Sequence, residues 1–167
     1  TPPKLVLYPT GPGQSRVIPN GGLQSYADVK FFPDGKSLMI CGNEPAHAAR
    51  CYVRPADGGP ARPITPEGTS KGWVSADGRA VLAQSVDGGY SIYALDGAAP
   101  RQVGALTAKD AVVRWSADGH ALLVTHDNEL PFRVERVDLV SGRRTVVVTG
   151  ARSRSGLLNV TSISMSD

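Results

Sequence analysis

A pentapeptide ending in Asp-Gly recurs three times at nearly even spacing, and this repeat restricts the fold more than any other feature of the sequence. Its copies are Phe31–Gly35, Val74–Gly78 and Trp115–Gly119. Self-similarity at a period of about 40 residues is typical of proteins built from stacked supersecondary units. We therefore expect each period to contain the same set of elements.

Four short apolar runs make up each period. The first ends in the pentapeptide, the second follows the Asp-Gly directly, the third comes after a polar loop, and the fourth follows a glycine-bearing turn and a basic residue. The runs are too short for a helix and are rich in Val, Ile, Leu and aromatic residues, which predicts strands. The Asp-Gly pairs predict tight two-residue hairpins in which both residues take a positive φ.

Several of these runs, such as Ala121–Val124 and Thr145–Val148, are apolar almost throughout, so both faces of their strands are expected to be buried. A four-stranded antiparallel sheet held between two neighbouring sheets meets that requirement. The sequence thus predicts an all-β fold made of β-propeller blades. The expected blades, all in one domain, span approximately residues 1–20 (partial), 21–66, 67–106, 107–150 and 151–167 (partial).

The two partial blades are expected from the ends of the sequence. Residues 5–18 match the third and fourth strands of a unit, and residues 160–167 match a first strand that runs into its Asp. Three whole blades and two partial ones predict either a fragment of a larger propeller or a homodimer in which two copies complete the ring.

Charge and hydropathy exclude two classes of partner. The net charge is +3 and the pI about 9.0, but the basic residues are scattered and lack the interleaved aromatic residues that stack on bases. No apolar stretch approaches the roughly 20 residues of a membrane-spanning helix. We expect neither nucleic-acid binding nor membrane insertion.

The repeat resembles that of the TolB-like, or WD-like, bacterial β-propellers. The match is carried by Phe32–Lys36, Cys51–Gly59, Ser91–Gly97 and Trp115–Gly119, and Val74 departs from it where tryptophan is usual. The resemblance implies a non-catalytic scaffold for protein binding and a periplasmic or extracytoplasmic location. The family also includes the gating or sensor propellers of prolyl-oligopeptidase-type peptidases and bacterial Ser/Thr kinases, which is the alternative function.

Two motifs suggest chemistry without its usual context. Residues 68–72 fit the G-x-S-x-G pattern of hydrolases, but no helical pattern follows the serine, so a loop between blades is the better interpretation. Cys41, His47 and Cys51 lack the paired spacing of a zinc site. The two cysteines are predicted to lie on neighbouring strands, where either a disulfide or two buried thiols would fit, and buried thiols are favoured. We expect no catalytic residues, no cofactor and no metal.

Loops that connect the second and third strands are the best candidates for binding a protein or peptide, because rigid strands hold their ends while their sequences vary. Two such connections, residues 42–50 and 126–133, combine charged with apolar or aromatic residues. The alternative for each charged residue is an ordinary solvated position. The candidate contact residues are Glu44, His47, Arg50, Asp127, Glu129 and Arg133.

Overall fold

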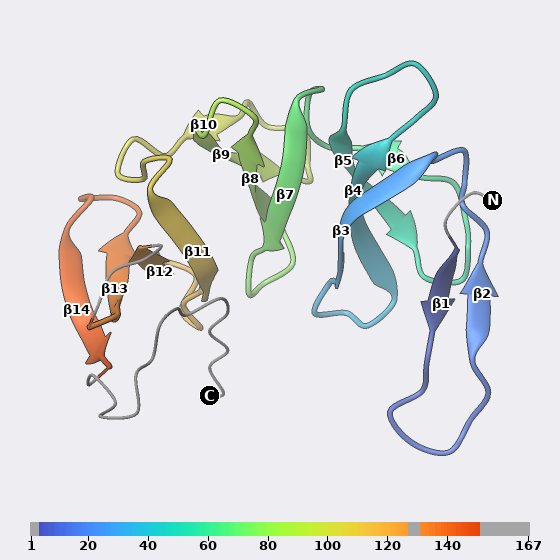
Figure 1. The fold of residues 1–167 in the computed structure, drawn as a ribbon, viewed down its shortest axis with the longest axis horizontal. Coiled ribbons are helices and arrows are strands. Elements are labelled where there is room, and N and C mark those ends of the chain that lie inside the picture. The colour runs from blue at the N-terminus through green and yellow to red at the C-terminus, as the bar shows by residue number, and fades with distance from the viewer. Residues whose placement is uncertain (1–3, 127–130, 151–167) are drawn as a thin grey trace.

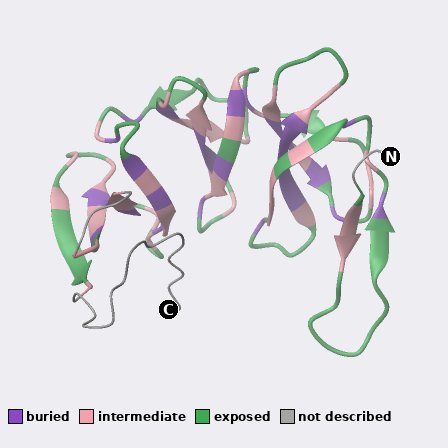
Figure 2. Ribbon diagram, in the orientation of Figure 1, coloured by how far each residue is buried: buried purple, intermediate pink, exposed green. Residues whose placement is uncertain are grey.

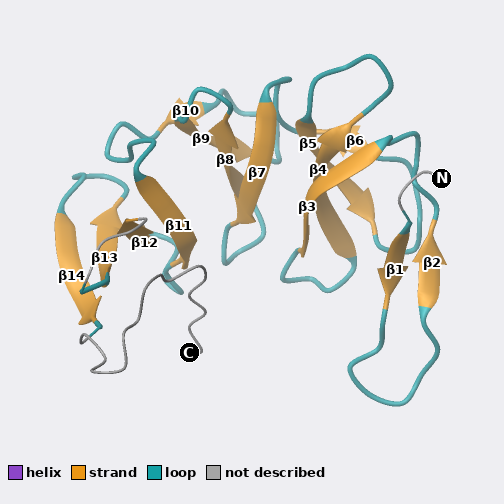
Figure 3. Ribbon diagram, in the orientation of Figure 1, coloured by secondary structure: helices purple, strands orange, loops and turns teal. Residues whose placement is uncertain are grey.

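The computed structural model describes residues 4–126 and 131–150, and all regular secondary structure in this part of the chain is β (Figure 3). The strands form one two-stranded and three four-stranded sheets, each antiparallel and in chain order. The two-stranded sheet contains β1 (Leu5–Leu7) and β2 (Arg16–Ile18). The first four-stranded sheet contains β3 (Ser25–Phe31), β4 (Ser37–Asn43), β5 (Arg50–Pro55) and β6 (Arg62–Pro63). The second contains β7 (Thr69–Val74), β8 (Ala80–Ser85), β9 (Tyr90–Ala94) and β10 (Arg101–Gln102). The third contains β11 (Asp110–Trp115), β12 (Ala121–His126), β13 (Arg133–Asp138) and β14 (Arg144–Thr149).

The four sheets follow one another along an arc (Figure 1). The first strands of successive four-stranded sheets contact each other, β3 with β7 and β7 with β11. This arrangement confirms the predicted all-β fold of four-stranded propeller blades. The partial blade expected at residues 151–167 lies outside the described residues.

The Asp-Gly turns join the first and second strands as expected, but they are not two-residue hairpins. Residues 32–36 separate β3 from β4, and the Phe32 N–H donates to the Ser37 carbonyl at 2.9 Å. Gly35 has φ +63°, whereas Asp34 is not in the positive-φ region. Instead, the Asp34 carboxylate accepts hydrogen bonds from the N–H groups of Lys36 and Ser37, at 2.8 and 2.9 Å. The aspartate therefore stabilises a longer turn through its side chain.

The turn of the third sheet shows the electrostatic effect of this geometry most strongly. Asp118 accepts hydrogen bonds from the Ser116 hydroxyl at 2.5 Å and the His120 N–H at 2.9 Å, and it forms an ion pair with Arg136. The hydrogen bond from Ser116, followed by those from His120 and Arg136, lowers the pKa of Asp118 to about 2. The turn aspartate is consequently ionised at any ordinary pH.

Three apolar clusters join residues of successive sheets. Figure 2 shows that many residues of the middle strands are buried. Leu38 and Ile40 of β4 pack toward Leu5 and Leu7 of β1. On its opposite face, the same strand contributes Met39 to the cluster shared with the second sheet. The predicted two-sided burial is thus confirmed for the middle strands.

The expectation of two-sided burial is wrong for β14. Val146, Val147 and Val148 are 46%, 46% and 36% exposed. β14 is the outer strand of its sheet, and among the described residues no further sheet packs against it. The apolar run therefore does not identify a buried strand here.

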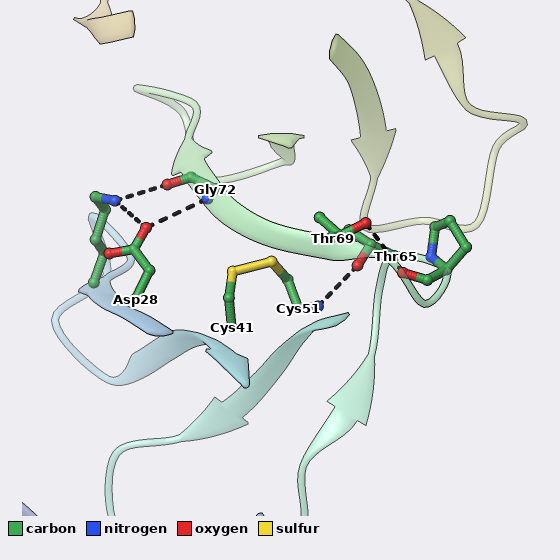
Figure 4. Close-up of a disulfide and its surroundings, with 8 residues drawn as sticks. Asp28, Cys41, Cys51, Thr65, Thr69 and Gly72 are labelled. Carbon is green, nitrogen blue, oxygen red and sulfur yellow. Dashed lines mark hydrogen bonds and ion pairs between the residues drawn. A yellow bond between two sulfur atoms is a disulfide. The ribbon is translucent and has the colours of Figure 1, made fainter. Parts of the chain in front are cut away.

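Hydrogen bonds of Lys30 and Asp28 connect the first strands of the first two four-stranded sheets (Figure 4). Lys30 forms an ion pair with Asp28 and donates to the Gly72 carbonyl at 2.8 Å, while Asp28 accepts from the Gly72 N–H at 3.3 Å. A Cβ atom at Gly72 would lie 2.5 Å from the Met39 sulfur. Glycine at this position lets the two sheets approach closely.

Candidate binding face

The antiparallel topology sorts the connections to two ends of the sheets. The Asp-Gly turns lie at one end. The connections between second and third strands, and those between sheets, lie at the other end, which we call the loop face. In the described part of the chain, the loop face consists of residues 19–24, 44–49, 64–68, 86–89, 103–109 and 131–132.

A disulfide holds the base of loop 44–49. Cys41 and Cys51 are directly opposite each other on β4 and β5, with their Cα atoms 3.9 Å apart, and they form a disulfide in which both residues are fully buried. The preference for two buried thiols was therefore wrong, because burial says nothing about whether the strand register places the cysteines opposite each other. With both sulfurs bonded, neither cysteine is available to bind zinc. Residues 4–126 and 131–150 contain no cluster of three or more potential metal ligands.

Backbone and side-chain hydrogen bonds attach loop 44–49 to the neighbouring loop 64–68. The Ala49 carbonyl accepts from the N–H groups of Gly68 and Thr69, at 2.8 and 2.9 Å. The Thr65 hydroxyl accepts from the Cys51 N–H at 2.8 Å (Figure 4). Loop 44–49 is thus restrained along one side as well as at its base.

Three of the predicted contact residues belong to this restrained loop or its edge. Glu44 and Arg50 form an ion pair at 2.6 Å, and Arg50 Nε donates to the Tyr52 hydroxyl at 3.0 Å. His47 Nδ1 lies 2.7 Å from Glu67 Oε1. The loop thereby contributes to one ion pair, Glu44–Arg50, and to one hydrogen-bonded pair, His47–Glu67, and both pairs are partly exposed to solvent.

Hydrogen bonding stabilises the ionised form of both glutamates. The hydrogen bond from Arg50 lowers the pKa of Glu44 below its ordinary value. The hydrogen bonds from His47 and from the Ala48 N–H lower the pKa of Glu67 in the same way. Both carboxylates are therefore charged at neutral pH.

The tip of the loop carries local backbone strain. Ala46 has φ +65° and is the one non-glycine residue with a positive φ in the described part of the chain. The Glu44 carbonyl accepts from the His47 N–H at 3.1 Å, which closes a turn around this residue. Strain of this kind persists where the surroundings fix the backbone and is frequent at binding sites.

The other predicted contact residues come from the connection between β12 and β13 and from the start of β13. Asp127 and Glu129 lie outside the described residues. Arg133 is exposed at the start of β13, in the third four-stranded sheet, and the second sheet separates it from loop 44–49 (Figure 1). Among the described residues, the structure therefore groups Glu44, His47 and Arg50 and places Arg133 apart from them.

Residues 68–72 run into β7, a strand, so the serine of the G-x-S-x-G pattern does not lie at a strand-to-helix turn. His120 directly precedes β12 and His126 is its last residue, so the two histidines lie at opposite ends of the strand.

Sequence reasoning missed Glu67 and a second polar cluster at the end of the third sheet. Arg144 makes two ion-pair contacts with the fully buried Asp110, at 2.8 Å each, and one with Glu135 at 3.0 Å. His126 lies 3.7 Å from each of the two carboxylates. These residues come from four strands at irregular spacing, so no sequence motif signals their contact.

The second cluster is best explained as structural. Burial of Asp110 favours its neutral form, but the hydrogen bonds from Arg144 and Thr107 outweigh that effect and lower its pKa. Arg144 also donates to the Ala105 carbonyl at 2.7 Å, in the connection from the second sheet. The cluster thus ties the third sheet to the loop that precedes it.

Comparison with solved structures shows that the fold is a β-propeller similar to that of TolB proteins. The structure is similar to TolB from Acinetobacter baumannii, with a TM-score of 0.62 and 21% identity over 81% of this chain and 35% of that one. A putative TolB from Agrobacterium tumefaciens gives a TM-score of 0.65 and 15% identity over 83% and 52% of the two chains. An oligogalacturonate lyase from Vibrio parahaemolyticus gives a TM-score of 0.57 and 14% identity over 89% and 47%.

The chain matches one curated relative in sequence, an uncharacterized peptidase, YuxL, of Bacillus subtilis strain 168. The two are 35% identical over 78 residues, which is 46% of this chain and 12% of the relative. No family model matches the sequence. The chain spans about a third to a half of the TolB structures and a smaller part of the peptidase. No helix in the described residues is long and apolar enough to cross a membrane.

Proposed function

We propose that the chain is a non-catalytic binding module that recognises a protein or peptide through its loop face. The observation that carries the proposal is loop 44–49, whose base is fixed by the Cys41–Cys51 disulfide while His47, at its tip, stays exposed. A loop ordered in advance loses little conformational entropy when it binds a partner. The candidate contact residues remain Glu44, His47, Arg50, Asp127, Glu129 and Arg133.

Site-specific photo-crosslinking in the source organism tests this role. A photoreactive amino acid replaces Ala48 on the loop face or, as the control, Ala99 at the opposite end of the second sheet; both alanines are exposed. We expect one defined protein or peptide to crosslink at residue 48 and not at residue 99. Substitution of Arg50 by alanine should reduce that crosslink. Equal crosslinking at both positions, or none at residue 48, would refute the proposed face.

The alternative is that these blades are the gating or sensor propeller of a larger enzyme, such as a prolyl-oligopeptidase-type peptidase or a bacterial Ser/Thr kinase. The partial match to the peptidase YuxL favours the peptidase version. The reading frame that contains this sequence distinguishes the two functions. A downstream hydrolase domain with peptidase activity would support the alternative, whereas a frame without a catalytic domain would exclude it.

Two further proposals concern assembly and location. The residue ranges 1–20 and 151–167 are proposed to be parts of incomplete blades, completed either by more of the same chain or by a second copy in a homodimer. A periplasmic or extracytoplasmic location is consistent with the disulfide, because disulfides persist in oxidising compartments. Fractionation of the source cells tests the location.

A further inference from the structure

Arg54 occupies a register position that carries an uncharged residue in the other two four-stranded sheets. It pairs with Leu38 of β4, and the residues at the same register in β9 and β13 are Tyr93 and Val137. Arg54 is only 1% exposed. A charged side chain therefore lies at a position that the repeat otherwise uses for packing between sheets.

The side chain of Arg54 faces the two-stranded sheet. Its cross-strand partner Leu38 belongs to the cluster packed against β1, and cross-strand partners share a face of the sheet. Arg54 Nη1 donates to the Pro19 carbonyl at 2.8 Å. A Cβ atom at Gly21 would lie 2.8 Å from Nη1, so the backbone of the turn after β2 rests directly on the guanidinium.

Most of the hydrogen-bonding capacity of this guanidinium is unused. An arginine has five N–H donors, and within residues 4–126 and 131–150 Nε has no acceptor and no carboxylate pairs with the group. The hydroxyl of Tyr26, buried in the same interface, also lacks a hydrogen-bond partner there. Tyr26 pairs with Gly42 and Arg54 pairs with Leu38, four positions apart on β4, so both side chains lie on the same face of the sheet. Burial raises the pKa of Tyr26, and the positive charge of Arg54 acts in the opposite direction. Buried charges in proteins are normally paired, because an unpaired charge is costly to remove from water.

We propose that Arg54 and Tyr26 form a binding site for a carboxylate, in the interface between the two-stranded sheet and the first four-stranded sheet. The planar guanidinium offers a pair of donors that matches two carboxylate oxygens, and the tyrosine hydroxyl supplies a third. This site uses none of the candidate contact residues and goes beyond the proposed function.

The carboxylate has two sources, an acidic side chain or a small free carboxylate. In the second four-stranded sheet, the residue equivalent to Arg54 is Tyr93. Tyr93 packs against a cluster that contains Met39 of β4, the second strand of the sheet before it. The sheet before Arg54 contains only β1 and β2, so among the described residues no strand beside β1 corresponds to β4. A strand in that place could present an Asp or Glu side chain to Arg54, whereas a free carboxylate would bind without it.

Nuclear magnetic resonance of the arginine Nε–Hε groups tests the site directly. The 167-residue chain is labelled with ¹⁵N-arginine and titrated with sodium acetate against sodium chloride at equal ionic strength. The Arg54 signal is identified by its loss in Arg54→Met or, if that variant does not fold, in Arg54→Tyr, which inserts the residue of the second sheet. We expect acetate to shift this signal saturably, while the signal of the exposed Arg79 stays unchanged.

Tyr26→Phe is the second variant, because it removes one donor and keeps the ring that packs in the interface. We expect it to weaken acetate binding at least threefold without removing the Arg54 signal. The same titration on the longest native form of the protein identifies the source. If the Arg54 signal of the longer protein is already shifted before acetate is added and does not respond to acetate, an acidic side chain occupies the site. If the signal still responds to acetate, the ligand is a free carboxylate. The proposal is overturned if the Arg54 signal stays at its chloride position in both proteins.

Discussion

Removing the disulfide between β4 and β5 should destabilise the protein by an amount that follows from the loop it closes. The bonded cysteines are separated by 10 positions. The loop-entropy relation gives about 9 cal/mol/K for a loop of about 11 residues, or about 2.8 kcal/mol at 25 °C. Reduction should lower the free energy of unfolding by this amount while leaving the packing atoms in place.

Urea unfolding of three samples measures the effect: the oxidised protein, the same protein in dithiothreitol, and the double variant Cys41→Ala/Cys51→Ala. We expect the reduced protein to lose about 2–3 kcal/mol of stability. The double variant should lose somewhat more, because both sulfur atoms leave a fully buried cluster. The reduced protein therefore separates the contribution of the crosslink from that of packing.

Two results would contradict this reasoning. A thiol assay on the denatured, unreduced protein should find no free thiol, and two free thiols would mean that the bond is not formed. If the bond is present but reduction changes the stability by less than about 0.5 kcal/mol, the unfolded chain already restrains this segment without the crosslink, and the entropy relation does not apply.

Three further predictions concern the sheet interfaces and turns. Gly72→Ala should cost about 1–3 kcal/mol by overpacking the interface between the first two four-stranded sheets, and Gly104→Ala, where a Cβ meets nothing within 4 Å, should cost much less in the same urea experiment. The pKa of Asp118 falls from 3.8, its ordinary value, to about 2 in the folded protein. The ionised carboxylate therefore stabilises the folded state at pH values above 3.8, and this contribution disappears as the pH falls toward 2. Thermal unfolding of the wild type and Asp118→Asn should therefore converge between pH 5 and pH 2. Arg144→Met should cost about 3–5 kcal/mol in urea unfolding, because it leaves the buried Asp110 without its ion pair.

Local patterns predicted the strands and the order of the sheets, because strand propensity, turn residues and the spacing of the repeat are all encoded within a few residues. The geometry of the turns was not predictable in the same way. The positive φ of Gly35 followed from the residue type, but the role of Asp34 depends on where its side chain points after the turn forms.

Contacts between distant residues account for most of what the sequence did not reveal at the candidate site. Glu67 pairs with His47 because the connection to the second sheet passes beside loop 44–49, and nothing in the local sequence marks it. The register that sets Cys41 opposite Cys51 likewise depends on the exact length of a loop. Arg54, in contrast, is visible in the sequence as a charged exception at a packing position, once the repeats are aligned.

The serial arrangement of the sheets has a mechanical consequence. A chain pulled from its ends should lose its sheets one at a time, and a repeat of about 40 residues should lengthen the chain by up to about 140 Å as it unravels. The first four-stranded sheet should release roughly 35 Å less, because the disulfide withholds the segment between positions 41 and 51 from extension. Under force, one sheet of the arc would thus be recognisable by its shorter step, and adding a reductant would erase the difference.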